Sequence, residues 1–551
     1  MWAVVTESPA LSGNFCVAHT LFRVERAGAR VGRRNFGEKP ERHEPHRLGL
    51  QPGHRPAACA AGGRPVALAD LVRSRDALWF GWNGEISADG DADVVEREGR
   101  IATVKLSATE HRGYYLGYSN SVLWPVFHNR LDVAQFEAGF FDQYMDVNRR
   151  LAALLKPLLR ADDVIWVHDY HLIPFAAELR RLGVENAIGF YLHIPFPPWQ
   201  TFMAIPEHHQ LARAVAAYDL IGLQTKADVA NLIDYIANGA NGRIVPDGRI
   251  RLFDRLLSVA SFPVGIDVAD FAKARRDARL VQARASVSRI IGVDRLDYTK
   301  GLPQKLKAFG RFLEKYPQYQ GQVVLTQIAP PTRESVDAYS DIRQQLESLA
   351  GSINGRFGEL DWVPIHYIHR STPRRRLAGI YRSSRIGMVT PLRDGMNLVA
   401  KEYVAAQDPE DPGVLILSQF AGAVEEMGEA LVVNPYNIEE SADVIRIALE
   451  MQLEERRSRY EALMAAVRKH DVRNWYQSFL AQLERVRAAD DPTRWRSPEP
   501  IRAALEKLEG ASREGRRSAQ PTSPRRQRSR GSSTIGDHPS EDSELSLKTC
   551  Q

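Results

Sequence analysis

The chain has 551 residues, more than one ordinary domain, which predicts two cores of roughly 200 residues each plus additional segments. Hydrophobic residues make up 44% and charged residues 26%, so the composition excludes wholesale disorder and a small disulfide-stapled scaffold. Of the net charge of +5, residues 1–60 carry +4 and residues 511–551 carry +3, which leaves −2 for residues 61–510 and indicates no nucleic-acid-binding surface there.

Neither a membrane span nor export is indicated by the sequence. No run approaches about 18 consecutive apolar residues, and the N-terminus lacks the basic flank of a secretory signal. Cys16, Cys59 and Cys550 all lie outside the body of the chain, which can therefore carry neither a disulfide framework nor a thiolate zinc site. We expect a soluble protein of the cytoplasm.

Short apolar runs alternate with helical patterns from about residue 78 to 420, which predicts parallel sheets covered by helices. A less regular stretch around Gly265 predicts the boundary between two α/β domains. After Asn437 the pattern is fully helical, and one of these helices could pack back across the domain interface. The predicted strands are Val164–His168, Gly189–His193, Leu220–Gln224, Arg289–Val293, Gln322–Ile328, Ile386–Thr390 and Val414–Ser418.

Two predicted strands of the first domain end in polar residues. Val164–His168 leads into Asp169, whose carboxylate can accept hydrogen bonds from sugar hydroxyls or can merely cap the next helix. Gly189–His193 ends in His193 before a proline-rich loop, where a histidine is either structural or a ligand. Because open α/β sheets bind ligands at the carboxyl ends of their strands, both residues are candidates for a binding site.

A pair of cations follows the predicted strand Arg289–Val293. Arg295 and Lys300 precede a helix, where free backbone N–H groups and the helix dipole favour an anion. Arg295 could hold phosphate oxygens in a bidentate fashion while Lys300 supplies a point charge, which suits a diphosphate. The alternative is a surface ion pair between Arg295 and Asp297.

The strand Ile386–Thr390 breaks into a glycine-containing turn that opens a further helix. Asp394 and Glu402 could share one face of this helix, with Asp394 at its N-terminus, so that one acid binds sugar hydroxyls and the other a ribose. The alternative is an ordinary amphipathic helix. Neither a Gly-x-Gly-x-x-Gly after a strand nor a Gly-x4-Gly-Lys-Ser/Thr loop occurs, so the standard dinucleotide and phosphate-loop fingerprints are absent.

Together these segments resemble the trehalose-6-phosphate synthases, the retaining glycosyltransferases of family 20. The resemblance runs from about Gly62 to about Val486 and implies an α/β fold of GT-B architecture, with two Rossmann-like domains facing a cleft. The motifs that carry it are Leu78–Trp82, Ser119–Pro125, His168–His171, Leu192–Pro197, Arg295–Gly301 and Thr390–Gln407.

The resemblance also implies a role for each matched residue. Arg295 and Lys300 would bind the donor diphosphate, while His193 and Asp394 would hold the donor glucose, and these four form the expected catalytic group. The remaining nucleotide-sugar residues would be Gly62, Gly63, Leu398, Val399 and Glu402. The residues for glucose 6-phosphate would be Tyr115, Trp124, Asp169 and Arg333, with Arg333 on the phosphate.

The implied reaction is glucosyl transfer from UDP-glucose to glucose 6-phosphate with retention, without metal or other cofactor. Cleavage makes the sugar positive and the departing UDP negative, so Arg295, Lys300 and helix N-termini should stabilise the transition state. The motifs supply no obvious carboxylate nucleophile of the kind that retaining hydrolases use, which favours attack from the front face. The alternatives are a catalytically impaired sugar-phosphate-binding pseudo-enzyme and another retaining nucleotide-sugar transferase.

The N-terminus departs from the family pattern. Family members begin with a strand like Val-Val-Ser-Asn-Arg, whose Arg binds the acceptor phosphate, and a loop that ends Gly-Gly-Leu-Ala-Val. Here only Gly62–Val66 resembles that loop, and residues 1–60 contain nothing like that strand. A wrong start or shifted reading frame that joins near Gly63–Pro65 is one explanation, and a genuine divergent extension is the other.

The expected domains follow from these observations. After the anomalous segment 1–60, residues 61–265 would form the acceptor domain and residues 266–470 the nucleotide-sugar domain, both Rossmann-like. Residues 471–490 would form the helix that packs back, and residues 491–551 an Arg- and Ser-rich disordered tail. The expected partners are the two small-molecule substrates, without nucleic acid or membrane, and a homo-oligomer is left open.

Overall fold

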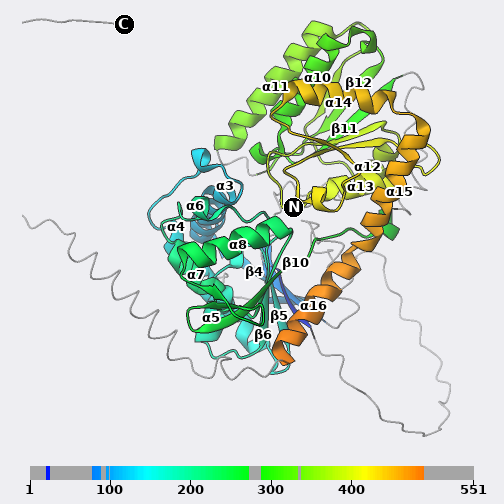
Figure 1. Cartoon of the computed structure of the whole chain (residues 1–551). Helices are drawn as coiled ribbons and strands as arrows, with labels where there is room; N and C mark the ends of the chain where they lie inside the picture. Colours follow the sequence, from blue (N-terminus) through cyan, green and yellow to red (C-terminus); the bar gives the residue numbers. More distant parts are fainter. Residues whose placement is uncertain are drawn as a thin grey trace, which may run out of the picture. The chain divides into compact units, whose positions relative to one another are not determined.

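The computed structural model describes residues 20–24, 77–87, 95–98, 100–271, 287–332 and 337–488. Its described strands form two sheets, each flanked by helices (Figure 1). We call the first sheet with its helices up to residue 261 the N-terminal lobe, and the second sheet with the helices from residue 302 to 469 the C-terminal lobe. No helix in these ranges is long and apolar enough to cross a membrane.

The sheet of the N-terminal lobe has ten described strands in the order β3-β4-β2-β1-β5-β6-β7-β10-β9-β8. Strands β5, β6, β7 and β10 run parallel to one another, so their carboxyl ends lie at one edge. The strands are β1 (Thr20–Val24), β2 (Leu78–Ser87), β3 (Glu96–Glu98), β4 (Ile101–Ser107), β5 (Val164–His168), β6 (Ala187–Tyr191), β7 (Leu220–Leu223), β8 (Arg243–Ile244), β9 (Ile250–Leu252) and β10 (Arg255–Ser261).

Strand β1 lies between β2 and β5 and runs antiparallel to both. The sequence predicts no counterpart of the family's first strand in residues 1–60, and the structure nevertheless places a strand of that segment inside the sheet. Because β1 is antiparallel to β5, its carboxyl end lies at the edge opposite to the one that carries Asp169. Val24, the last residue of β1, accordingly pairs with Val164 at the start of β5, away from Asp169.

The helices of the N-terminal lobe pack around this sheet. A capping box between Ser107 and Glu110 starts the first of them, which continues directly into a π-helical segment, His111–Leu123. The helices are α2 (Ala108–Glu110), α3 (Trp124–Phe127), α4 (Phe140–Leu155), α5 (Phe175–Arg181), α6 (Trp199–Phe202), α7 (His208–Val215) and α8 (Lys226–Gly239).

The sheet of the C-terminal lobe is parallel throughout its six described strands, in the order β13-β12-β11-β14-β15-β16. Alternate residues such as Ile290 and Ile291 belong to different hydrophobic clusters, so both faces of the sheet are buried. The strands are β11 (Ser288–Val293), β12 (Val323–Ile328), β13 (Ile365–Ile368), β14 (Ile386–Val389), β15 (Val414–Ser418) and β16 (Leu431–Val433).

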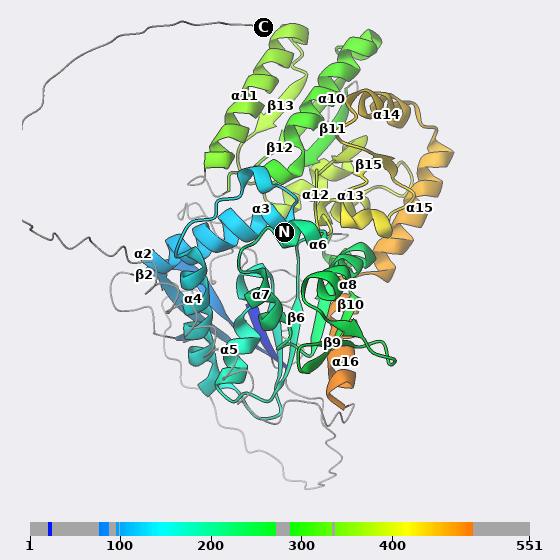
Figure 2. The same ribbon diagram turned by 60° about the vertical axis from the view of Figure 1, so that its left-hand side comes forward.

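Helices cover both faces of this second sheet (Figure 2). On one face α10 contacts α14, since Tyr316, just after α10, donates a hydrogen bond to Asp443 at 2.7 Å. On the other face α12 and α13 lie side by side, with the rings of Tyr381 and Tyr403 6.3 Å apart. The helices are α10 (Leu302–Lys315), α11 (Asp337–Phe357), α12 (Arg374–Arg382), α13 (Leu398–Ala406), α14 (Ile438–Glu450) and α15 (Leu453–Lys469).

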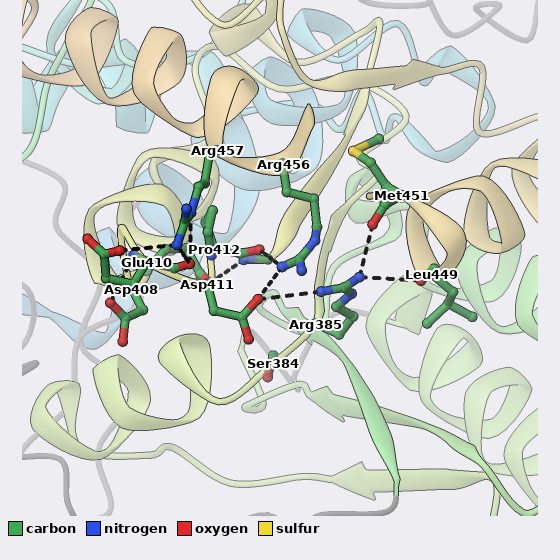
Figure 3. Close-up of polar contacts among 12 residues, drawn as sticks. Ser384, Arg385, Asp408, Glu410, Asp411, Pro412, Leu449, Met451, Arg456 and Arg457 are labelled. Carbon is green, nitrogen blue, oxygen red and sulfur yellow. Dashed lines mark hydrogen bonds and ion pairs between the residues drawn. The ribbon is translucent and has the colours of Figure 1, made fainter. Parts of the chain in front are cut away.

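Helix α15 is attached to the C-terminal lobe by arginine contacts (Figure 3). The guanidinium of Arg456 donates to Asp411 and to the Pro412 carbonyl, both at 2.5 Å. Arg385, the residue before β14, donates to the Met451 carbonyl at 3.1 Å and lies 3.8 Å from the same Asp411. These contacts connect the start of α15 to the loop before β15.

The last described helix, α16 (Val472–Ala488), returns to the N-terminal lobe (Figure 1). Phe479 stacks on Trp166 of β5 with centroids 4.5 Å apart, and Trp475 lies 5.0 Å from the same ring. Gly189 and Gly222 make this approach possible, because a Cβ at either position would lie 2.7–2.8 Å from the Phe479 ring. Helix α16 thus completes the core of the first sheet with residues from the far end of the chain.

Candidate active site

The cationic residues of the C-terminal lobe lie at the carboxyl end of β11. Arg295 lies two residues beyond β11, and Lys300 ends the short turn Tyr298–Lys300 before α10. The Arg295 guanidinium is 3.4 Å from Asp297, so the predicted alternative of an Arg–Asp pair is present. The pair is not on the surface, however, because the side chains are only 12% and 0% exposed.

Lys300 forms a buried ion pair with Asp394, whose loop follows β14. Burial, the largest single influence, would raise the pKa of Asp394, but the charge and hydrogen bond of Lys300, together with other positive charge including His128, lower it to about 2. Asn397 donates a further hydrogen bond to the same carboxylate at 3.1 Å. Asp394 is therefore a fixed negative charge beside a fixed positive one at the edge where β11 and β14 end.

Helix α13 begins at Leu398, so Asp394 belongs to the preceding loop and does not share a helical face with Glu402. That part of the sequence interpretation is wrong, because Asn397 adopts a left-handed conformation with φ 70° and the helix starts only after it. Leu398 and Val399 stand in the first turn, where backbone N–H groups lack helical partners. Burial raises the pKa of Glu402, one turn further, to about 7, against the opposing charge of Arg374.

Two of the residues predicted to bind the acceptor are aromatic side chains of the N-terminal lobe. Trp124 begins α3, and the Arg295 guanidinium lies 5.4 Å from its ring centroid, which joins the two lobes at this point. Tyr115, in the π-helical segment, is stacked between His111 at 5.4 Å and His171 at 5.8 Å. Both aromatic side chains are at most 5% exposed, so their positions are set by packing.

Asp169 follows β5 in a strained backbone conformation. Its φ of 74° and ψ of 163° are rarely adopted by a residue with a side chain, and such strain costs about 1–3 kcal/mol. Its side chain makes no capping hydrogen bond to the turn that follows, so the predicted capping alternative does not hold. The carboxylate instead accepts a hydrogen bond from the backbone N–H of His193 at 3.4 Å.

His193 lies beyond the end of β6, which stops at Tyr191, two residues earlier than predicted. Its backbone leaves the strand ladder because its carbonyl accepts a hydrogen bond from Gln224 at 3.1 Å. The turn that carries Asp394 packs on it: a Cβ at Gly395 would lie 2.4 Å from the His193 carbonyl oxygen. His193 and Asp394 therefore come from different lobes and lie close together.

Three predicted site residues, Gly62, Gly63 and Arg333, lie outside the described residues. Eight of the others lie at or just beyond the ends of strands and helices of the two lobes: Trp124, Asp169, His193, Arg295, Lys300, Asp394, Leu398 and Val399. Tyr115 and Glu402 lie inside the π-helical segment and α13, respectively. Among the described residues there is no group of three or more His, Cys, Asp and Glu side chains that could hold a metal ion.

Sequence reasoning missed three residues at this site. Arg393 reaches the N-terminal lobe, where its guanidinium donates to the Phe196 carbonyl at 3.4 Å. His168 contacts His193, and Trp475 of α16 lies 5.9 Å from the His193 ring. His168 stands in the same motif as Asp169 and could have been noticed there, whereas no local signal marks a tryptophan some 280 residues away.

The chain matches known proteins over most of its length. The model of the family described as Glycosyltransferase family 20 matches residues 53–485. The chain belongs to this family. A relative named trehalose-6-phosphate synthase, from Klebsiella pneumoniae, is 45% identical over 445 residues, which cover 79% of this chain and 94% of the relative.

Solved structures of the family confirm the GT-B fold. An α,α-trehalose-phosphate synthase (UDP-forming) from Burkholderia xenovorans, in complex with glucose 6-phosphate, is 48% identical with a TM-score of 0.72, covering 74% of this chain and 93% of that one. A trehalose-6-phosphate synthase from Escherichia coli, bound with UDP-2-fluoro glucose, is 43% identical with a TM-score of 0.72, covering 76% and 95%. The family relationship predicted from the motifs is therefore confirmed.

Proposed function

We propose that this chain transfers a glucosyl unit from UDP-glucose to glucose 6-phosphate, giving α,α-trehalose 6-phosphate and UDP with retention of configuration. The observation that carries the proposal is the meeting of the lobes, where Arg295 of the C-terminal lobe lies 5.4 Å from the Trp124 ring of the N-terminal lobe. The relatives named above bind a phosphorylated glucose and a UDP-sugar analogue, which supports the same pair of substrates here.

The donor would bind to the C-terminal lobe. Arg295 and Lys300 would hold the diphosphate, since both cations stand at the carboxyl end of β11 before α10. The first turn of α13 would hold the nucleotide through the backbone of Leu398 and Val399 and through Glu402. The buried carboxyl of Glu402 could bind the ribose hydroxyls as a charged acceptor, because hydrogen bonds from those hydroxyls would replace the hydration that burial removes.

The acceptor would bind to the N-terminal lobe. Tyr115, Trp124 and Asp169 would contact the sugar, and the strained backbone of Asp169 is typical of residues placed for a ligand. Arg333 would hold the phosphate by the family pattern, and Gly62 with Gly63 would form the family's glycine loop. His193 and Asp394 would hold the donor glucose between the two sets.

The proposed reaction breaks the bond between the anomeric carbon and the leaving phosphate oxygen and forms a bond to the acceptor oxygen on the same face. The acceptor hydroxyl proton passes to the departing phosphate oxygen. Arg295 and Lys300 would stabilise the negative charge that develops on UDP, in a site where Lys300 is buried, Arg295 is only 12% exposed, and little reorganisation is needed. Asp394, held ionised by Lys300, would stabilise the positive charge on the sugar.

Release of UDP tests the proposal. The purified chain is supplied with UDP-glucose and glucose 6-phosphate, UDP is measured by a coupled assay, and the sugar product is identified by mass and by its anomeric NMR signals. Reactions without acceptor and with free glucose serve as controls. Arg295→Ala should lower kcat by about 10²–10³-fold, while Arg311→Ala, on the exposed side of α10, should not.

A second version of the chain tests whether the antiparallel strand β1 affects activity. Its first 63 residues are replaced by a family-type strand and Gly-Gly loop, and both proteins are assayed together. Turnover by both supports the function for the chain as it stands, and turnover by the second alone assigns the function to the body of the chain. If neither releases UDP, the proposal is wrong, and binding of glucose 6-phosphate without turnover then favours a sugar-phosphate-binding protein.

A further inference from the structure

His168 and His193 form a hydrogen-bonded pair of imidazoles. Nδ1 of His168 lies 3.0 Å from Nε2 of His193, and the rings are stacked with centroids 5.3 Å apart and planes 21° apart. His168 ends β5 and pairs in register with Tyr191, the last residue of β6, two residues before His193. The ladder therefore brings the end of β6 beside His168, and the loop that follows carries His193 onto the His168 ring.

The surroundings of this pair are aromatic, and His168 is buried whereas His193 is partly exposed. His168 is 3% exposed and its ring lies 4.4 Å from Trp166 and 6.1 Å from Trp475 of α16. Burial lowers the pKa of His168 well below its usual range and lowers the pKa of His193 to about 3. Both rings are therefore neutral at neutral pH, and in the contact between them one nitrogen donates while the other accepts.

The contact has a chemical consequence for the second nitrogen of His193. In a neutral imidazole only one ring nitrogen carries a proton, so the bond made by Nε2 decides whether Nδ1 is a donor or an acceptor. Within the described ranges no hydrogen bond reaches Nδ1 of His193, because its contacts there are made by Nε2, by its backbone N–H and by its carbonyl. Nδ1 is thus the nitrogen left for a ligand.

We propose that His168 is a positioning residue, which holds the His193 ring in one tautomer and one orientation through the bond between Nδ1 of His168 and Nε2 of His193. This inference rests on the proposed function, in which His193 faces the donor glucose. A ring free to flip or to change tautomer would offer the donor sugar the wrong hydrogen-bonding partner part of the time. Such misplacement lowers the rate of the chemical step more than it lowers substrate binding.

Three substitutions separate the hydrogen bond from the volume of the ring. His168→Asn keeps a polar atom near the place of Nδ1, His168→Gln carries it toward the place of Nε2, and His168→Leu removes it. The same three changes at His208 provide the control, because His208 is also buried in the N-terminal lobe and its Nδ1 contacts the Tyr235 hydroxyl at 3.1 Å.

Kinetics give the first readout. His168→Leu and His168→Gln should lower kcat by about 10–100-fold, with KM for glucose 6-phosphate and Kd for UDP changed by less than about threefold, and His168→Asn should recover most of kcat. The His208 series should leave kcat per folded molecule unchanged. If His168→Leu does not fold, the comparison of His168→Asn with His168→Gln still decides. Equal kcat for these two, or an unchanged kcat in all three, overturns the proposal.

The second readout needs no turnover. In ligand-free protein with 15N-labelled histidine, the ring signals of His193 are assigned by their loss in His193→Gln. One neutral tautomer is expected in the wild type and in His168→Asn, and a mixture in His168→Gln. An unchanged tautomer in His168→Gln overturns the proposal whatever the kinetics show. Wild-type protein that releases no UDP would instead refute the proposed function, and the NMR result would still decide this inference.

Discussion

Glu402 carries a buried carboxyl group whose replacement by a neutral amide should stabilise the ligand-free protein at alkaline pH. Burial raises its pKa from the usual 4.5 to about 7, although Arg374 opposes the shift. The folded protein therefore holds this proton more tightly than the unfolded chain does. The resulting stability is fully present below pH 4.5 and is lost as the pH rises through about 7. The difference between the pKa of Glu402 in the unfolded chain and in the folded protein corresponds to at most about 3 kcal/mol in the free energy of unfolding.

The test compares Glu402→Gln with the wild type in urea unfolding, followed by ellipticity and tryptophan fluorescence, from pH 5 to pH 8.5. The amide keeps the size of the side chain and cannot ionise. We expect the variant to gain little at pH 5 and about 2–3 kcal/mol at pH 8.5. Glu461→Gln, on the exposed side of α15, is the matched control for the loss of one carboxylate.

The same variant should bind UDP more weakly, since the proposed ribose contact loses a charged acceptor. A gain in stability together with a loss of affinity for UDP would show that the carboxyl of Glu402 lowers the stability of the fold but is needed for ligand binding. The reasoning is refuted if the stability of Glu402→Gln relative to the wild type is the same at pH 5 and at pH 8.5.

Three further predictions concern the ion pair of Lys300, the helix α16 and the arginine contacts of α15. Lys300→Met leaves the Asp394 carboxylate buried without its cation, so we expect the free energy of unfolding to fall by about 3–5 kcal/mol at pH 8 and by less at pH 5, where Asp394 can take up a proton. Equal losses in urea unfolding at both pH values would contradict this. Trp475→Ala removes a ring packed on Trp166 and should lower the free energy of unfolding by about 3–5 kcal/mol, with a smaller loss for Trp475→Phe. An unchanged unfolding midpoint would show that α16 does not complete this core. Arg456→Met deprives the Pro412 carbonyl of its donor and should cost about 1–3 kcal/mol, with kcat unchanged below the unfolding transition. Arg468→Met, at an exposed position of α15, is its control, and a lower kcat in Arg456→Met would assign these contacts to the active site instead.

Much of the fold could be predicted because strands buried on both faces are continuous apolar runs. β5 at Val164–His168 and β15 at Val414–Ser418 have the predicted bounds. β6 and β14 end earlier than predicted, at Tyr191 and Val389, because the chain there turns into loops that are held by contacts with other segments. Apolarity alone does not mark that change, since the loop residues after β6 are also buried.

The sequence by itself determined which residue types stand at the strand ends, and so it identified Asp169, Arg295, Lys300 and Asp394 as candidates. It could not decide which of them meet, because that depends on strand order. Lys300 and Asp394 are 94 positions apart and pair because β11 and β14 are neighbours in a parallel sheet. Only the tertiary structure joined His168 to His193 and brought Trp475 of α16 against both rings, since burial of α16 on the first sheet is a long-range contact. The direction of β1 was likewise decided by pairing with β2 and β5, for which its five residues carry no local signal.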